Sequence, residues 1–228
     1  MAKFSKIIRQ NNENRLIKNF IKVFKQSLNK KLKNSSRFSF VLTGGKSPIK
    51  LYKKIAEVKN IYWEKVDFFI GDERYVKENS KNSNLYMCKK YLLNKLKIPN
   101  KQIFKIETNK KNIKEDVAKY EKVLKKYFKN KKIKFDLLLL GIGLDGHIAS
   151  LFKNNIKIKN NKSVTHVKKK DFSRITLTLS SINNSNLIFL WAPGKKRFKL
   201  VKKILTDRNK KYPVSFLREK NNVLFYSN

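Results

Sequence analysis

The sequence predicts an α/β fold: a mostly parallel sheet covered by helices on both faces. Short apolar runs alternate along the chain with amphipathic segments of about 10 to 18 residues. The run 137–140 is apolar throughout, which is typical of a strand buried on both sides of a parallel sheet. Polar turns follow several of these runs directly. No internal repeat or linker divides the 228 residues, so we treat 1–228 as one domain.

Hydrophobic periodicity places the individual elements. Before the apolar run 137–140 we expect, in order, a helix at 14–31, a strand at 37–42, a helix ending at Ala56, a strand at 66–70, a helix at 83–96, a short strand at 103–106 and a helix at 113–128. After it we expect a polar excursion or hairpin at 154–170, strands at 174–179 and 187–191, a helix at 195–205 and a last strand at 223–226.

The chain is strongly basic: 56 Lys and Arg against 16 Asp and Glu give a formal charge of +40. Such a charge is compatible with a nucleic-acid or membrane partner. The lysines are nevertheless spread almost evenly, and only eight of the 56 basic residues are Arg, the side chain preferred for specific phosphate contacts. Evenly dispersed charge is typical of a solvated surface, so we expect no specific nucleic-acid partner.

Cys88 is the only cysteine, which excludes a disulfide framework and a cysteine metal site. The first ten residues lack the apolar core of a signal peptide, and no apolar run reaches the roughly 20 residues needed to cross a bilayer. We therefore expect a cytoplasmic protein that does not bind membranes and is a monomer or a weak homo-oligomer.

Three polar turns, at 43–48, 71–74 and 141–147, follow apolar strands. Because the carboxyl ends of parallel strands meet at one edge of a sheet, right-handed crossovers would bring these turns together. They predict one shared site.

The first turn is suited to holding an anion. Gly44 and Gly45 expose backbone N–H groups, Ser47 is a candidate cap for the following helix, and Pro48 suits its first turn. The turn also ends like a Walker A motif, but Phe40 stands where that motif requires Gly, which argues against a nucleotide hydrolase. A simple capped turn is the alternative.

In the second turn, Asp72, Glu73 and Arg74 stand together after a buried strand. The guanidinium of Arg74 could hold a carbonyl oxygen or a carboxylate, and Asp72 could orient it or a catalytic histidine. An ion pair among the three residues is the alternative.

In the third turn, Asp145 and His147 flank Gly146. An imidazole titrates near pH 6.5, so His147 is the candidate general base, whereas a lysine is almost fully protonated at pH 7. The alternative is a plain strand-to-helix turn in which the histidine only hydrogen-bonds. The other histidine, His166, lies in the polar excursion, and we expect it at the surface.

Two arginines are candidates for closing on a phosphate. Arg174 begins a strand, and Arg197 lies at the start of a helix that follows Gly194. The neighbouring Lys195 and Lys196 are equally compatible with solvated surface charge.

Four segments together resemble the 6-phosphogluconolactonase family: LTGGKSPIKLY at 42–52, FFIGDERYV at 68–76 with Ser83-Asn84, FDLLLLGIGLDGHIASLF at 135–152, and RITLTL at 174–179 with Ile182-Asn183. The similarity runs in the family's order from about residue 14 to residue 217. It implies a Rossmann-like sheet of the sugar-phosphate isomerase type, no metal or other cofactor, and a sugar-phosphate lactone as substrate. The implied reaction is hydrolysis of 6-phospho-D-glucono-1,5-lactone in the oxidative pentose phosphate pathway.

The resemblance also implies roles for matched positions. His147 would activate water, with Asp145 shaping its loop. Arg74 would polarise the lactone carbonyl or hold the sugar, with Asp72 beside it. The remaining matched positions would bind substrate, with Gly44, Gly45 and Ser47 lining the pocket and Arg174 and Arg197 holding the 6-phosphate.

Some positions depart from the family pattern. GGSTP is GGKSP here, Arg197 replaces the usual lysine of GxxK, and the tail lacks the usual aromatic-then-Asp ending. Two other functions remain as alternatives. A glucosamine-6-phosphate deaminase-like isomerase shares the Asp-Gly-His sequence but requires a Glu where this chain has Phe152. A basic nucleic-acid-binding protein without activity would bind in a strongly salt-dependent manner, independently of His147.

Overall fold

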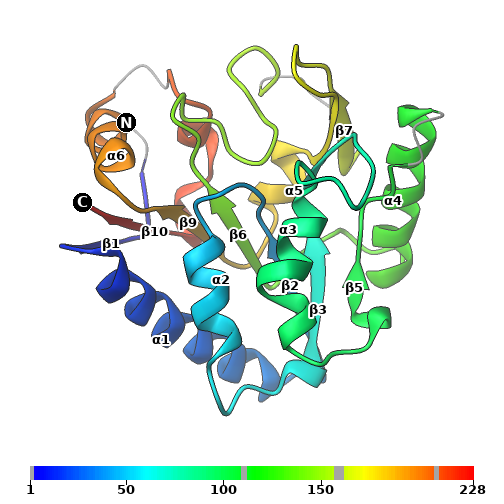
Figure 1. The fold of residues 1–228 in the computed structure, drawn as a ribbon, viewed down its shortest axis with the longest axis horizontal. Helices are drawn as coiled ribbons and strands as arrows, with labels where there is room; N and C mark the ends of the chain where they lie inside the picture. Colours follow the sequence, from blue (N-terminus) through cyan, green and yellow to red (C-terminus); the bar gives the residue numbers. More distant parts are fainter. Residues whose placement is uncertain (1–2, 109–111, 157–161, 208–210) are drawn as a thin grey trace.

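The computed structural model describes residues 3–108, 112–156, 162–207 and 211–228 (Figure 1). Its main feature is a seven-stranded parallel sheet in the order β1-β10-β9-β6-β2-β3-β5. The strands are β1 (Lys6–Gln10), β2 (Phe38–Leu42), β3 (Val66–Ile70), β5 (Ile103–Phe104), β6 (Leu137–Gly141), β9 (Ile188–Ala192) and β10 (Asn222–Ser227). The predicted fold class is confirmed; β1, which pairs with β10, was not predicted.

Helices cover both faces of this sheet. They are α1 (Glu13–Leu32), α2 (Ile49–Ala56), α3 (Asn84–Tyr91), α4 (Ile113–Tyr127), α5 (Leu179–Asn183) and α6 (Lys195–Thr206). Successive strand residues point to opposite faces, so neighbouring aromatic residues report which helix lies on which face. On β10, Phe225 contacts Phe20 of α1 at 5.1 Å between ring centroids, whereas Tyr226 contacts Phe198 of α6 at 5.6 Å. Helices α1 and α6 therefore cover opposite faces.

The chain changes its direction of travel across the sheet between β2 and β6. From β2 it continues to β3 and β5 at one edge, and from β6 it continues to β9 and β10 toward the other. The two central strands pair through Phe40 with Leu137 and Val41 with Leu138. In sheets of this kind the turns after the two strands diverge and leave a crevice at their carboxyl ends.

A second, three-stranded antiparallel sheet lies next to that crevice. It consists of β4 (Asp72–Arg74), β8 (Arg174–Leu177) and β7 (Val164–Val167), in the order β4-β8-β7. Strand β4 follows β3 after a single residue, Gly71, where a Cβ atom would lie only 3.0 Å from Val41 Cγ1. Arg74 and Arg174 are direct cross-strand partners. This sheet was not predicted, although a strand at 174–179 was.

The structure corrects two predicted elements. The helix expected at 83–96 ends at Tyr91, because Leu92 leaves helical geometry (φ −132°, ψ −70°). This break allows the adjacent Leu92 and Leu93 both to be buried. The strand expected at 174–179 ends at Leu177, since the Thr178 side chain caps α5 by accepting a hydrogen bond from the backbone N–H of Ser181.

The excursion expected at 154–170 lies partly outside the described residues. Its described part contains β7, which forms a hairpin with β8. His166 pairs with Ile175 in this hairpin and is half-buried, so its expected surface position is only partly correct.

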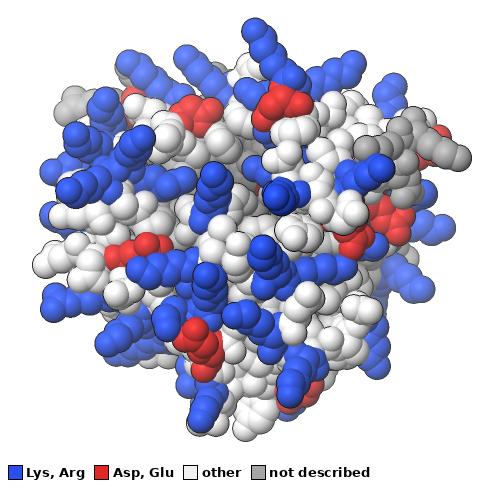
Figure 2. Space-filling view, viewed as in Figure 1, with Lys and Arg blue, Asp and Glu red and all other residues white. Residues whose placement is uncertain are grey.

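On the face of the molecule that Figure 2 shows, basic side chains are dispersed rather than gathered in one area. Figure 2 shows Lys and Arg across the whole visible face, with acidic side chains scattered among them. Within the described ranges, no helix is long and apolar enough to cross a membrane.

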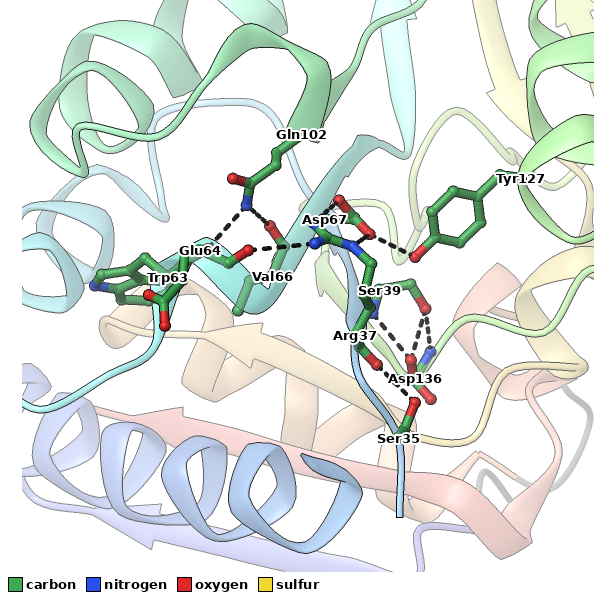
Figure 3. Close-up of polar contacts among 10 residues, drawn as sticks. All are labelled: Ser35, Arg37, Ser39, Trp63, Glu64, Val66, Asp67, Gln102, Tyr127 and Asp136. Carbon is green, nitrogen blue, oxygen red and sulfur yellow. Dashed lines mark hydrogen bonds and ion pairs between the residues drawn. The ribbon is translucent and has the colours of Figure 1, made fainter. Parts of the chain in front are cut away.

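A polar cluster ties together the amino ends of the central strands (Figure 3). Asp67 of β3 accepts hydrogen bonds from Arg37 through both carboxylate oxygens and from the Tyr127 hydroxyl at 2.8 Å. Ser39 donates from its backbone nitrogen and from Oγ to Asp136 Oδ2, each at 2.9 Å. These contacts lie at the amino ends of the strands, on the side of the sheet opposite the crevice. We call this side the amino edge of the sheet and the side with the crevice its carboxyl edge.

Candidate active site

One cavity of about 480 Å³ lies over the carboxyl ends of β2 and β6. Residues from all three polar turns line it, together with residues of the β7–β8 turn and the start of α6. Eight of the nine predicted site residues are among them: Gly44, Gly45, Ser47, Asp72, Arg74, His147, Arg174 and Arg197. The ninth, Asp145, is hydrogen-bonded to His147. Segments far apart in the sequence thus meet in one cavity.

His147 is oriented by Asp145. Its Nδ1 lies 2.5 Å from Asp145 Oδ1, and its backbone N–H donates to the same oxygen at 3.2 Å. Burial raises the pKa of Asp145, but the hydrogen bonds and charge of His147 outweigh it and hold this pKa below its ordinary value. A carboxylate on Nδ1 favours the tautomer that carries its proton there, which leaves the lone pair on Nε2.

The third turn brings its backbone close to the imidazole. A Cβ atom at Gly143 would lie 2.1 Å from the His147 ring, so only glycine fits. Gly146 has a φ of +80°, and a Cβ there would lie 2.7 Å from the Tyr212 ring. Ala149, which also lines the cavity, has a φ of +47°, a left-handed conformation that non-glycine residues seldom adopt. The turn is therefore fixed tightly around His147.

Strand β4 divides its three charged residues between two environments. Asp72 and Arg74, two apart on the strand, line the cavity, whereas Glu73 points away from it. Asp72 Oδ2 accepts a hydrogen bond from Ser150 Oγ at 2.8 Å, and Arg74 Nη1 donates to the carbonyl oxygen of Asn82 at 2.8 Å. Within the described residues no ion pair joins the three, so the alternative of a local ion pair is not observed.

Glu73 anchors the start of α3. Its buried carboxylate accepts hydrogen bonds from Ser83 Oγ at 3.0 Å and from the backbone N–H groups of Asn84 and Leu85 at 2.7 and 2.8 Å. Burial raises the pKa of Glu73 to about 7, although these hydrogen bonds act in the opposite direction. The carboxylate fixes the end of the helix that carries Asn84 into the cavity wall.

The first turn differs from the prediction. Helix α2 has Pro48 as its N-cap and no side-chain cap, so the expected capping by Ser47 is wrong. The Ser47 carbonyl oxygen instead accepts a hydrogen bond from Trp191 Nε1 at 3.1 Å, which holds the turn against β9. Gly44 is required because a Cβ there would overlap the Asn84 side chain at 1.9 Å.

The two predicted phosphate-binding arginines have different surroundings. Arg174 donates from Nη2 to Asp171 Oδ2 at 2.6 Å, while its buried Nη1 has no partner among the described residues. Arg197 donates from Nε to the carbonyl oxygen of Ile142 at 2.9 Å. Burial lowers the pKa of Arg197, and the charge of Glu13 opposes this shift. Lys195 and Lys196 are exposed and do not line the cavity.

Several residues of the cavity wall had no predicted role, among them Ser150, Asn84 and Lys169. Ser150 holds Asp72, Asn84 contacts Gly44, and the Nζ of Lys169 lies 4.1 Å from the centre of the Phe152 ring. Asn84 and Ser150 lie within segments that carry the family resemblance, but no role was predicted for them. Lys169 is one of 56 basic residues, and nothing local distinguishes it.

Comparison with known proteins establishes the family. A family model described as glucosamine-6-phosphate isomerases/6-phosphogluconolactonase matches residues 11–226. The chain belongs to this family. A 6-phosphogluconolactonase of Thermotoga maritima is 30% identical over 208 residues, which cover 90% of this chain and 91% of the relative. One from Nostoc sp. is 34% identical over 200 residues, covering 85% and 83%.

Solved structures of 6-phosphogluconolactonase share the fold. The enzyme of Thermotoga maritima superposes with a TM-score of 0.84 at 28% identity, covering 97% of this chain and 98% of that one. The enzyme of Trypanosoma cruzi gives 0.85 at 26% identity, covering 99% and 95%. The resemblance noted in the motifs is thereby confirmed: the chain is an enzyme of the 6-phosphogluconolactonase family.

Proposed function

We propose that this protein hydrolyses 6-phospho-D-glucono-1,5-lactone to 6-phosphogluconate, a step of the oxidative pentose phosphate pathway. The observation that carries the proposal is the position of the His147–Asp145 pair beside the cavity that Arg74, Arg174 and Arg197 also line. Ester hydrolysis of a phosphorylated sugar requires a base, a stabiliser of developing negative charge and a distant anion clamp. The names of the relatives support the same reaction.

In the proposed mechanism, His147 Nε2 removes a proton from water as the water oxygen attacks C1 of the lactone. Asp145, on Nδ1, stabilises the imidazolium that forms. Negative charge develops on the carbonyl oxygen, where Arg74 would stabilise it, with Asp72 beside Arg74 on β4. The C1–O5 bond then breaks, the imidazolium returns the proton to O5, and the new carboxylic acid ionises.

The phosphate would lie against Arg174 and Arg197. The buried Nη1 of Arg174 offers an unpaired donor, and a guanidinium fork matches phosphate oxygens well. Binding the remote phosphate holds the lactone carbonyl near His147 and so lowers the entropic cost of reaction. Gly44, Gly45 and Ser47 would line the sugar-binding part of the cavity.

The two alternative functions find less support. The position where a deaminase requires Glu holds Phe152, whose ring lies 4.6 Å from that of His147, so this part of the cavity wall lacks the required carboxylate. A nucleic-acid-binding role would favour a concentrated basic surface, whereas the visible face has basic side chains throughout (Figure 2).

The proposed function is tested by assaying acid release from freshly prepared 6-phosphogluconolactone beside ammonia release from glucosamine 6-phosphate. The spontaneous hydrolysis of the lactone is subtracted. We expect lactone hydrolysis well above background and no ammonia release. Ammonia release without lactone hydrolysis would favour the deaminase, and the absence of both activities would contradict the proposal.

A further inference from the structure

Two buried polar atoms without a partner belong to residues of the same cavity wall. In the described part of the chain, the buried side-chain atoms that lack a hydrogen-bond partner are Asn84 Oδ1, Arg174 Nη1 and Ser215 Oγ. Asn84 and Arg174 line the cavity, whereas Ser215 does not. Because buried polar atoms are nearly always paired, two such atoms on residues that line one cavity indicate groups that a ligand completes. Arg174 supplies a donor for phosphate, and Asn84 supplies an acceptor.

The orientation of the Asn84 amide is fixed by its surroundings. Its Nδ2 donates to the carbonyl oxygen of Asp72 at 2.7 Å, and a flipped amide would place an oxygen against that acceptor. The backbone N–H of Asn84 is held by Glu73, and the side chain lies against Gly44. Asn84 is only 2% exposed, so rotation to reach bulk water is blocked. The Oδ1 acceptor is therefore preorganised.

An amide oxygen selects for a particular ligand group. It accepts hydrogen bonds and donates none, so an ionised phosphate or carboxylate, which presents only acceptors, does not pair with it. A sugar hydroxyl does. We propose that Asn84 Oδ1 accepts a hydrogen bond from a ring hydroxyl of the bound lactone and makes the enzyme select for the hydroxylated sugar. This inference rests on the proposed lactonase function.

The test compares the parent lactone with its 2-deoxy, 3-deoxy and 4-deoxy analogues, each prepared fresh by oxidising the corresponding glucose 6-phosphate derivative. For one analogue, the wild type should lose about 10- to 100-fold in kcat/KM, because the buried acceptor is left unpaired. Asn84→Ala should lose a similar factor on the parent lactone and show no further loss on that analogue. The two losses are then not additive, as expected for groups in contact.

Ser150→Ala is the matched control, since Ser150 contacts Asp72 from its side chain while Asn84 contacts it at the backbone. A purely structural effect lowers kcat/KM for every substrate by one factor, so this variant should keep the wild-type preference among the four lactones. Asn84→Leu, which is close to Asn in size and has no acceptor, replaces the alanine variant if that variant does not fold.

The outcomes separate this inference from the proposed function. If the wild type does not hydrolyse the parent lactone, the proposed function itself is wrong. If the wild type hydrolyses it but treats all three analogues equally, or if the Asn84 variants keep the wild-type discrimination, Asn84 does not recognise a hydroxyl and the inference alone is overturned.

Discussion

The two edges of the parallel sheet differ in how completely their buried polar groups are paired. At the amino edge, Asp67 accepts hydrogen bonds from Arg37 and Tyr127, and Asp136 accepts hydrogen bonds from Ser39 (Figure 3). Asn186 also donates to Asp136, and the Lys31 ammonium forms an ion pair with it. At the carboxyl edge, two buried atoms of residues that line the cavity, Asn84 Oδ1 and Arg174 Nη1, have no hydrogen-bond partner in the described part of the chain. Paired groups hold strands in register, whereas unpaired groups are available to a ligand.

This comparison indicates a division of labour within one sheet. Substitutions at the amino edge should change the free energy of unfolding and leave the chemistry of folded molecules unchanged. Substitutions of the charged residues that line the cavity at the carboxyl edge should change catalysis with little effect on stability. The variants below test that division, from the largest expected effect to the smallest.

His147→Ala should lower kcat by about 10²- to 10⁴-fold, because it removes the proposed general base. The melting temperature should change little, since this side chain is partly exposed and its hydrogen bonds lie within its own turn. The rate is measured with fresh lactone and corrected for spontaneous hydrolysis. A variant with the parental rate would show that another group activates water.

Arg37→Ala should destabilise the protein by about 3 kcal/mol, because it leaves the buried carboxylate of Asp67 without its cation. Chemical denaturation measures this loss, and kcat per folded molecule should stay unchanged. Arg218→Ala is the matched control: Arg218 is exposed, and its stability effect should stay within about 0.5 kcal/mol. Equal effects of the two variants would contradict the proposed role of the amino-edge cluster.

Glu73 should make stability depend on pH. Its pKa of about 7 in the folded protein exceeds the ordinary value of 4.5, so its contribution is fully present below pH 4.5 and is lost as pH rises toward 7. The loss is on the order of 3 kcal/mol at most. The test compares the melting temperatures of wild type and Glu73→Gln from pH 4.5 to 8. The pH-dependent contribution of the histidines is present in both proteins and cancels in the difference. The difference should shift in favour of the variant as pH rises; a constant difference would argue against the raised pKa.

Arg174→Met should raise KM for the lactone by about tenfold and change kcat less, because it removes the proposed phosphate contact and leaves the proposed base in place. Lys196→Ala, at an exposed position outside the cavity, is the control for general loss of positive charge. Similar KM changes in both variants would mean that the overall charge of the chain, rather than Arg174, attracts the substrate.

The sequence predicts the parallel sheet well because its signal is local. The runs at 38–42, 66–70 and 137–141 are short and strand-like, and each ends in a polar turn, so the strands and the meeting of their turns follow from simple rules. His147 and Asp145 could be found for the same reason: they lie within one turn.

The missed features depend on contacts between distant segments. Strand β4 has only three residues, all charged, and exists because it pairs with β8 about 100 residues later. The role inferred for Asn84 depends on an amide held by Asp72 and placed against Gly44, which no periodicity reveals. The missing Ser47 cap has a similar cause, because Trp191 of β9 holds that turn.

The most direct test of the division between the two edges is a titration with 6-phosphogluconate, the proposed product, followed through backbone amide NMR signals. We predict shifts at the amides of the turns 43–47, 71–74 and 141–150 and at Arg174, with signals of Arg37, Ser39, Asp67 and Asp136 unchanged. Shifts centred on the amino-edge residues, or no saturable shift in the three turns, would contradict the account.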